Sequence, residues 1–166
     1  MTMRAPETKI MRREDFPSVR ETLRREGHTL VFTNGCFDIL HSGHTSYLFF
    51  ARAQGDALVV GLNSDRSVKT GKGDKRPVNP EEERARVLAA LECVDYVVVF
   101  DEDEPAPLIG EILPDVLVKG EDWAHYVSGR ETVEQNGGKV VLAPLVQGRS
   151  TTSTIQRIID VYGTDS

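Results

Sequence analysis

Two histidines three residues apart are the first feature of this sequence that points to chemistry. His41 and His44 follow an apolar run that begins at Leu30, and Gly43 stands between them. If a helix begins here, both imidazoles lie on nearly the same side, and Gly43 leaves the backbone open to close approach by a ligand. A helix N-terminus carries unpaired N–H groups and partial positive charge, so this pattern favours an anion such as phosphate.

Two other interpretations of the histidine pair stay open at this point. Asp38, His41 and His44 are all zinc-ligand types, although the sequence offers no obvious further ligand cluster. A pair of histidines near a helix start can also simply cap the helix or pack against it. The preceding Thr33, Asn34 and Gly35 and the intervening Gly43 favour the phosphate interpretation.

A second candidate phosphate site lies near the C-terminal end of the sequence. Gly148 and Arg149 are followed by the hydroxyl residues Ser150, Thr151 and Thr152 at the expected start of the last helix. One hydroxyl is enough for an N-cap, whereas several in succession beside an arginine present additional donors. The segment therefore predicts a second phosphate-binding helix start.

A basic segment, Lys69 to Arg76, contains Lys72 and two glycines and is predicted to be a mobile loop. Such a loop is either a solvated surface or a lid that closes over polyphosphate.

Arg84 shares a helical stripe with Val87 and Leu88, so its side chain either snorkels to the surface or reaches into a site.

A polar segment follows the apolar run Val116 to Val118, an expected strand, and therefore lies at a strand's carboxyl end. Lys119, Gly120, Glu121 and Asp122 could recognise base or ribose edges by hydrogen bonding, and Trp123 could be core filling or part of the site.

Composition narrows the function classes. The chain has 166 residues, 20 basic and 26 acidic, and a net charge of -6, which argues against a general nucleic-acid partner. No apolar run approaches the roughly 20 residues of a membrane span, and no secretory signal opens the sequence. Two distant cysteines, without a CxxC pair, fit a reducing cytoplasm. Neither a Walker motif nor a GxGxxG fingerprint is present.

Alternating strand and helix patterns predict the fold. Helical patterns separate five valine-rich runs, which indicates a single Rossmann-like α/β domain: a five-stranded, mostly parallel sheet with helices on both faces. Residues 28–166 form this domain, preceded by an N-terminal arm, residues 1–27, with a possible helix from Glu14 to Arg25. The expected strands are Leu30 to Thr33, Ala57 to Leu62, Tyr96 to Phe100, Val116 to Val118 and Val140 to Ala143.

Five further helices are expected, at Ser42 to Gln54, Pro80 to Leu91, Pro105 to Ile112, Ser128 to Gln135 and Thr151 to Val161. The second has the clearest start, because Asn79 can cap it, Pro80 suits its first position and Glu82 stands at the capping-box position.

With these motifs in place, the sequence resembles the HxGH nucleotidyltransferase superfamily in its cytidylyltransferase-like branch. HSGH at 41–44, preceded by TNGCFD at 33–38, carries the superfamily resemblance. Five further segments resemble the bacterial D-glycero-β-D-manno-heptose 1-phosphate adenylyltransferases: NSD (63–65), KGDKRPVNPEEER (72–84), LPDVLVKGEDW (113–123), NGGKVV (136–141) and GRSTT (148–152). Related cytidylyltransferases have Ile-Ser-Thr-Thr where this chain has Arg149 to Thr152, which favours the heptose branch.

The resemblance implies a function: transfer of AMP from ATP to the sugar 1-phosphate, with release of pyrophosphate. It implies that His41 and His44 donate to the triphosphate, that Thr33 holds the α-phosphate and that Lys72 comes from the lid. Asp38, Asn63 and Asp65 would contact the sugar substrate. The remaining nucleotide or phosphate contacts would come from Asn34, Gly35, Cys36, Phe37, Gly43, Arg84, Lys119, Gly120, Glu121, Asp122, Gly148, Arg149, Ser150, Thr151 and Thr152.

The resemblance also implies partners. Magnesium would come with the ATP phosphates, without a dedicated protein site. The expected assembly is a homodimer or larger homo-oligomer, with a separate heptose 7-phosphate kinase upstream and no nucleic-acid or membrane partner. Competing functions are a cytidylyltransferase for glycerol 3-phosphate or another small phosphate, a non-catalytic nucleotide-binding module, and a zinc hydrolase built on Asp38, His41 and His44.

Overall fold

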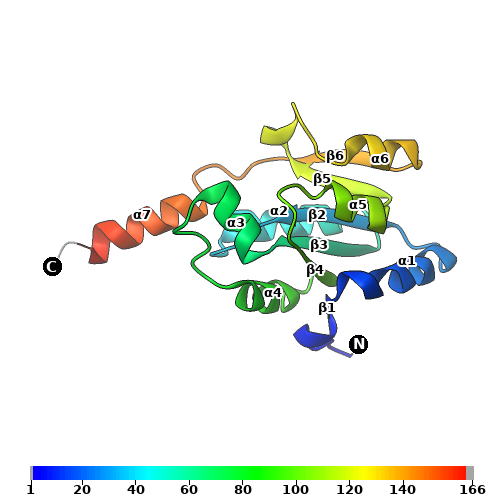
Figure 1. Cartoon of the computed structure of the whole chain (residues 1–166), viewed down its shortest axis with the longest axis horizontal. Helices are drawn as coiled ribbons and strands as arrows, with labels where there is room; N and C mark the ends of the chain where they lie inside the picture. Colours follow the sequence, from blue (N-terminus) through cyan, green and yellow to red (C-terminus); the bar gives the residue numbers. More distant parts are fainter. Residues whose placement is uncertain (1, 164–166) are drawn as a thin grey trace.

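The computed structural model describes residues 2–163 and confirms the α/β architecture. Within these residues the strands are β1 (Ile10–Met11), β2 (Leu30–Gly35), β3 (Ala57–Asn63), β4 (Tyr96–Phe100), β5 (Val116–Gly120) and β6 (Lys139–Ala143). They form one six-stranded sheet in the order β1-β4-β3-β2-β5-β6, and every neighbouring pair is parallel (Figure 1).

The α-helices are α1 (Phe16–Arg25), α2 (Ser42–Arg52), α3 (Asp65–Lys72), α4 (Glu81–Ala89), α5 (Ala106–Ile112), α6 (Arg130–Gln135) and α7 (Thr151–Tyr162). Short 3-10 turns lie at Pro6–Thr8, Arg13–Asp15 and Glu121–Trp123.

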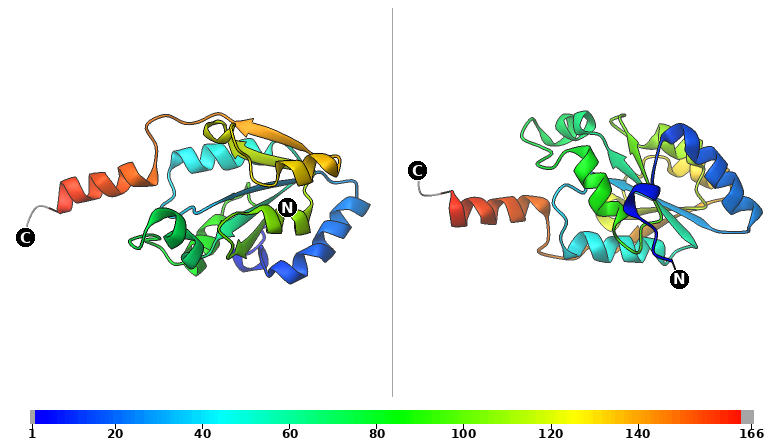
Figure 2. Two further views of the ribbon diagram at one scale, coloured as in Figure 1. Left: turned by 45° about the horizontal axis from the view of Figure 1, so that its top comes forward. Right: turned by 90° about the horizontal axis from the view of Figure 1, so that it is seen from below.

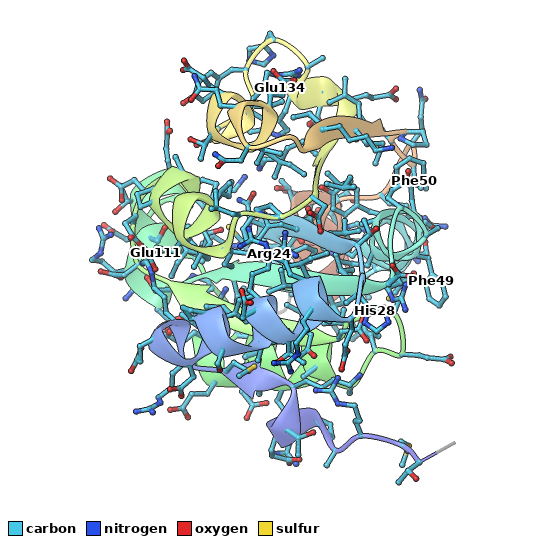
Figure 3. All side chains as sticks on the ribbon, turned by 90° about the vertical axis from the view of Figure 1, so that its right-hand side faces the viewer. Arg24, His28, Phe49, Phe50, Glu111 and Glu134 are labelled. Carbon is cyan, nitrogen blue, oxygen red and sulfur yellow. The ribbon has the colours of Figure 1, made fainter. Side chains whose placement is uncertain are left out.

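Two apolar clusters, one on each face of the sheet, hold the helices in place. Leu48 of α2 and Leu88 of α4 belong to the cluster on one face, whereas Phe16 of α1, Ile109 of α5 and Val133 of α6 belong to the cluster on the other. Figure 3 shows this division, with α1 and α5 on the opposite side of the strands from α2. The strands are nearly continuous apolar runs because both faces are covered.

The N-terminal segment supplies the sixth strand, one more than expected. β1 extends the sheet beyond β4, and the buried Lys9 ammonium donates to the carbonyls of Leu91 and Val94, 3.1 and 2.8 Å away. Phe16 and Leu23 of α1 are buried in the core. Two residues are too short for an apolar pattern to reveal, which explains why β1 was not predicted. Met1 and residues 164–166, the ends of the predicted arm and domain, lie outside the described residues.

Two local predictions were wrong. The basic segment is not a loop throughout: α3 runs to Lys72 and ends at Gly73, whose φ of 95° suits glycine. Asn79 does not cap α4, because Pro80 occupies the cap position and the Asn79 amide donates to the carbonyl oxygen of Asp38.

The chain order creates a crevice between β2 and β5. From β2 the chain builds outward through β3 and β4, and it then returns to place β5 and β6 on the other side of β2. Open α/β sheets bind ligands where the strand order reverses in this way, outside the carboxyl ends of the strands. None of the helices within residues 2–163 is long and apolar enough to cross a membrane.

Candidate active site

The start of α2 places the two histidines at the carboxyl end of β2. His41 is the N-cap, and its Nδ1 accepts the Gly43 N–H at 3.1 Å. In return, the His41 N–H donates to Nδ1 of His44 at 3.3 Å. This reciprocal cap has the arrangement of a capping box, in which two imidazoles replace the usual serine and glutamate side chains.

The cap determines which ring nitrogen carries the proton. A neutral imidazole has one N–H, and Nδ1 is the acceptor in both rings, so the proton lies on Nε2. The rings stack with their centroids 3.9 Å apart and an interplanar angle of 25°. Two Nε2–H donors therefore lie side by side, free of the cap, at the N-terminus of a helix.

Both imidazoles are held neutral in the ligand-free protein. Burial lowers the pKa of His44 from 6.5 to about 4, and the neighbouring His41 adds to the effect. Burial also lowers the pKa of His41, assisted by the positive charge of Arg149. An anion bound at the Nε2 atoms of the two rings would counter both effects, because opposite charge favours the protonated form.

The loop after β2, which contains Phe37, is strained and packs against His44. Phe37 has a φ of 44°, which is unusual for a residue with a side chain, and its ring lies 5.4 Å from the His44 ring. Gly35 makes room for it, since a Cβ there would stand 2.8 Å from the Phe37 ring. Phe37 is therefore buried beneath the imidazole rather than exposed as a lining of the nucleotide site.

The start of α7 meets the start of α2. Thr151 Oγ1 donates to the carbonyl oxygen of Ile39 at 3.4 Å, and a Cβ on Gly43 would stand 3.2 Å from Cβ of Arg149. Ser150 caps α7 by accepting the Ser153 N–H at 3.0 Å. Gly43 thus permits close approach by the second helix start, and two helix N-termini converge on one place.

Asp38, predicted to contact the sugar substrate, instead holds the loop before α4. Its fully buried carboxylate accepts hydrogen bonds from Arg76 Nε at 2.7 Å, Val78 N at 2.8 Å and Asn79 N at 2.9 Å. Burial alone would raise the pKa of Asp38, but these donors outweigh it and lower the pKa. With this carboxylate committed to Arg76, the proposed zinc triad is not assembled.

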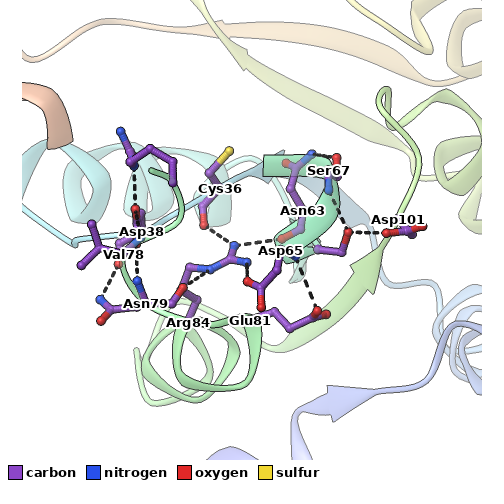
Figure 4. A network of polar contacts seen from close by, with 12 residues as sticks. Cys36, Asp38, Asn63, Asp65, Ser67, Val78, Asn79, Glu81, Arg84 and Asp101 are labelled. Atoms are coloured by element: carbon purple, nitrogen blue, oxygen red, sulfur yellow. Dashed lines mark hydrogen bonds and ion pairs between the residues drawn. The ribbon is translucent and has the colours of Figure 1, made fainter. Parts of the chain in front are cut away.

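Arg84 is the centre of a second buried network, shown in Figure 4. It is 1% exposed and donates to the carbonyls of Asn79, Cys36 and Asn63 at 2.8 to 2.9 Å and to the Asp65 carboxylate at 2.9 Å. The side chain therefore neither snorkels nor offers its charge openly to a phosphate. It ties the loops after β2 and β3 to α4, and Asn63 and Asp65 belong to this network.

The hydroxyl of Thr33 is engaged by other groups of the protein. Its fully buried hydroxyl lies 2.6 Å from the Tyr47 hydroxyl and donates to the Val118 carbonyl at 3.0 Å. The structure thus shows Thr33 joining β2, α2 and β5, and its contact with the α-phosphate stays a prediction. No sequence motif pointed to Tyr47, although this residue lies about one helical turn after His44.

The end of α3 brings positive charge close to Cys36, just after β2. Burial raises the pKa of the half-buried Cys36 thiol, and the charges of Lys72, Arg84 and Arg76 act in the opposite direction. Lys72 is exposed, whereas the other two cations are engaged within the protein. Lys72 is therefore the cation of this group that is available to a ligand beside Cys36.

The segment after β5 lies across the crevice from β2. The Glu121 carboxylate accepts the Leu145 N–H at 3.0 Å, while the Lys119 ammonium lies 5.7 Å from the centroid of the Trp123 ring. Trp123 is 49% exposed, so the core-filling interpretation is wrong. Within residues 2–163, no group of three or more His, Cys, Asp or Glu side chains is placed to hold a metal ion.

Comparison with known proteins agrees with this geometry. Residues 32–158 match the cytidylyltransferase-like family. The bifunctional protein HldE of Syntrophotalea carbinolica is 56% identical over 94% of the chain, and that of Geobacter sulfurreducens is 57% identical over 84%; the matches cover 32% and 29% of those proteins. The chain thus spans about a third of the length of these curated relatives.

Solved structures show the same fold. The lipopolysaccharide core biosynthesis protein of Thermoplasma volcanium superposes with a TM-score of 0.61 and 26% identity, over 74% of this chain and all of that one. Pantoate-beta-alanine ligase of Francisella tularensis, at 18% identity, gives a TM-score of 0.61 over 94% of this chain and 79% of its own, which shows the fold alone. The predicted HxGH resemblance is confirmed: the chain belongs to the cytidylyltransferase-like family and is a nucleotidyltransferase.

Proposed function

We propose that this chain transfers the AMP moiety of ATP to D-glycero-β-D-manno-heptose 1-phosphate. An oxygen of the sugar phosphate attacks the α-phosphorus of ATP, the bond from that phosphorus to the bridging oxygen breaks, and pyrophosphate leaves with the bond's electron pair. Such a transfer needs no enzyme nucleophile. It depends on in-line positioning and on donors aimed at the charge that develops on phosphate oxygens.

The observation that carries the proposal is the pair of Nε2–H donors on His41 and His44, placed where two helix N-termini meet. The two N–H groups would bind non-bridging oxygens of the triphosphate. Ser150 to Thr152 and Arg149 would bind it from the α7 side, and Lys72 from α3. The buried Asp38 and Arg84 networks would keep these elements in position rather than contact the substrate.

Magnesium belongs to this proposal as an ion carried by ATP. When bound, it neutralises charge on the phosphate oxygens and keeps several of its waters. The groups proposed to bind the triphosphate are imidazole N–H, hydroxyl, guanidinium and ammonium donors, which suit phosphate oxygens and not a cation. The chain's own contribution is therefore a set of donors for the phosphates.

The choice of acceptor rests on the relatives. Their name marks them as bifunctional, and this chain matches about a third of their length, which fits a transferase domain joined to a second activity. The Thermoplasma volcanium structure is named for lipopolysaccharide core biosynthesis. Both favour a sugar phosphate of lipopolysaccharide synthesis as the acceptor, and the proposal includes a homo-oligomeric assembly.

A pyrophosphate-release assay with magnesium tests the proposal. ATP and CTP are each combined with heptose 1-phosphate, glycerol 3-phosphate and phosphoethanolamine. Turnover is expected only with ATP and the heptose phosphate. Turnover with CTP and glycerol 3-phosphate would move the chain to the competing cytidylyltransferase function, and ATP binding without turnover in any mixture would favour a non-catalytic nucleotide-binding module.

A further inference from the structure

Two polar side chains in the crevice between β2 and β5, Asn34 and Lys119, make no hydrogen bond or ion pair within residues 2–163. The carboxamide of Asn34 makes no hydrogen bond to any residue in the range 2–163, although its Oδ1 is buried. Within the same range, the Lys119 ammonium makes neither a hydrogen bond nor an ion pair. Buried polar groups are nearly always paired, so the unpaired Asn34 oxygen needs an explanation. Lys119 is half-buried, and its ammonium lies over the Trp123 ring with hydrogen-bonding capacity left for an acceptor.

The register places the two residues side by side. Phe32 pairs with Leu117, and the hydroxyl of Thr33 donates to the carbonyl of Val118 at 3.0 Å. Asn34 and Lys119 are the next residue on each strand, just beyond the last hydrogen bond that joins β2 to β5. They therefore line the crevice at the point where the strand order reverses.

They also lie on the opposite face of the sheet from the histidine pair. Phe32 and Leu117, two residues earlier, belong to the apolar cluster under α1 and α5, whereas Leu48 of α2 belongs to the other cluster. Side chains two apart on a strand share a face, so Asn34 and Lys119 follow Phe32 and Leu117. Burial lowers the pKa of Lys119, and the acidic Asp122 and Glu104 counteract it, which agrees with this placement.

We infer that Asn34 and Lys119 bind hydroxyl groups of the sugar acceptor, across the crevice from the phosphates held at the two helix starts. A hydroxyl both donates and accepts, so neighbouring hydroxyls of one sugar ring satisfy a carboxamide and an ammonium together. A phosphate would satisfy the ammonium but would leave the Asn34 oxygen without a donor. This inference rests on the proposed function, and it assigns to these residues a role in selecting a polyhydroxylated acceptor.

Isothermal titration calorimetry with mannose 1-phosphate and with inorganic phosphate tests the inference without requiring turnover. The wild-type chain is expected to bind the sugar phosphate at least ~10-fold more tightly than inorganic phosphate. Asn34→Leu and Lys119→Met should each weaken sugar-phosphate binding by roughly 10- to 100-fold and leave the Kd for ATP within about twofold. Lys139→Met, an exposed lysine at the start of β6, is the matched control and should change neither Kd.

Three results would overturn the inference: equal binding of mannose 1-phosphate and inorganic phosphate, unchanged sugar-phosphate binding in both variants, or a loss confined to ATP. Thermal unfolding of each variant establishes that the fold is intact, and Asn34→Asp, which keeps an acceptor, should retain more sugar binding than Asn34→Leu. Absence of turnover with heptose 1-phosphate would contradict the proposed function alone, because the calorimetric comparison would still decide the role of the crevice.

Discussion

Helices α2 and α7 begin with the same kind of reciprocal cap and then differ in support. His41 and His44 close the start of α2, and Ser150 and Ser153 close the start of α7. Helix α2 buries Leu48 and Ala51 against the sheet, whereas α7 buries no residue and projects away from the body in every view (Figures 1 and 2).

This difference shows that a cap specifies where a helix begins, while tertiary packing determines how firmly that start is held. An isolated helix of about 12 residues is only marginally stable in water. Helix α7 therefore relies on the few tertiary contacts near its first turn. The proposed phosphate donors of α2 are therefore held in place before a ligand binds, and we expect those of α7 to adjust when it binds.

The largest expected effect is on the α2 donors. His44→Asn keeps an acceptor near the position of Nδ1, so the cap survives, but it removes the Nε2–H donor. We expect kcat to fall by roughly 10²- to 10³-fold, as for loss of one transition-state donor. His44→Gln, which places an N–H near the lost donor, should retain more activity. Pyrophosphate release measures both, and equal kcat for wild type and His44→Asn would contradict the role.

The difference in support predicts different stability losses for the two helices. Leu48→Ala removes a fully buried side chain and should cost about 2–5 kcal/mol in the free energy of unfolding. Ile159→Ala, at a residue 52% exposed on α7, should change it by less than about 0.5 kcal/mol. Urea unfolding of both variants compares them, and a similar loss for Ile159→Ala would show that α7 is packed in solution.

A smaller effect is expected at the start of α7. Arg149→Met removes a charge that would bind the triphosphate in the ground state and the transition state alike. We expect the KM for ATP to rise by roughly 10-fold with little change in kcat. Arg157→Met, further along the exposed face of α7, is the matched control and should leave KM unchanged. A fall in kcat at constant KM would instead place Arg149 in the transition state.

The last expected effect is gradual and concerns the pH dependence of stability. The pKa of His44 is about 4 in the folded protein and 6.5 for the ordinary side chain, so the unfolded chain binds more protons between these values. The contribution of neutral His44 is therefore complete above pH 6.5 and is lost as the pH falls toward 4. Thermal unfolding of wild type should show a steeper decline over this window than His44→Asn, and identical slopes would refute the shift.

The sequence predicted the order of the main strands and helices because buried parallel strands are continuous apolar runs and the helix starts have clear signals. It did not predict β1, which is two residues long and acquires its strand geometry by pairing with β4. It also did not predict α3, because Gly71 and the run of charges around Lys72 are typical of loops, while Val68 buries against the body and stabilises the helix.

The positions of the residues at the two helix starts were predicted, whereas the contacts of the residues around them were not. Local sequence placed His41, His44 and Ser150 at helix starts, because capping is a short-range interaction. The partners of Asp38 and Arg84 come from residues up to 41 and 48 positions away, and no local pattern encodes such contacts. The contacts of Thr33 were not predicted for the same reason, because its hydroxyl pairs with Tyr47 and with the carbonyl of Val118 on a distant strand.

The capping box at the start of α2 is expected to hold two neutral imidazoles with their protons on Nε2. A ¹H–¹⁵N NMR titration of the ligand-free protein tests it most directly, because the ring nitrogens report both tautomer and protonation. We expect His41 and His44 to be neutral at pH 7 with the proton on Nε2, and His44 to titrate with a pKa of about 4. A proton on Nδ1, or a His44 pKa near 6.5, would contradict the account.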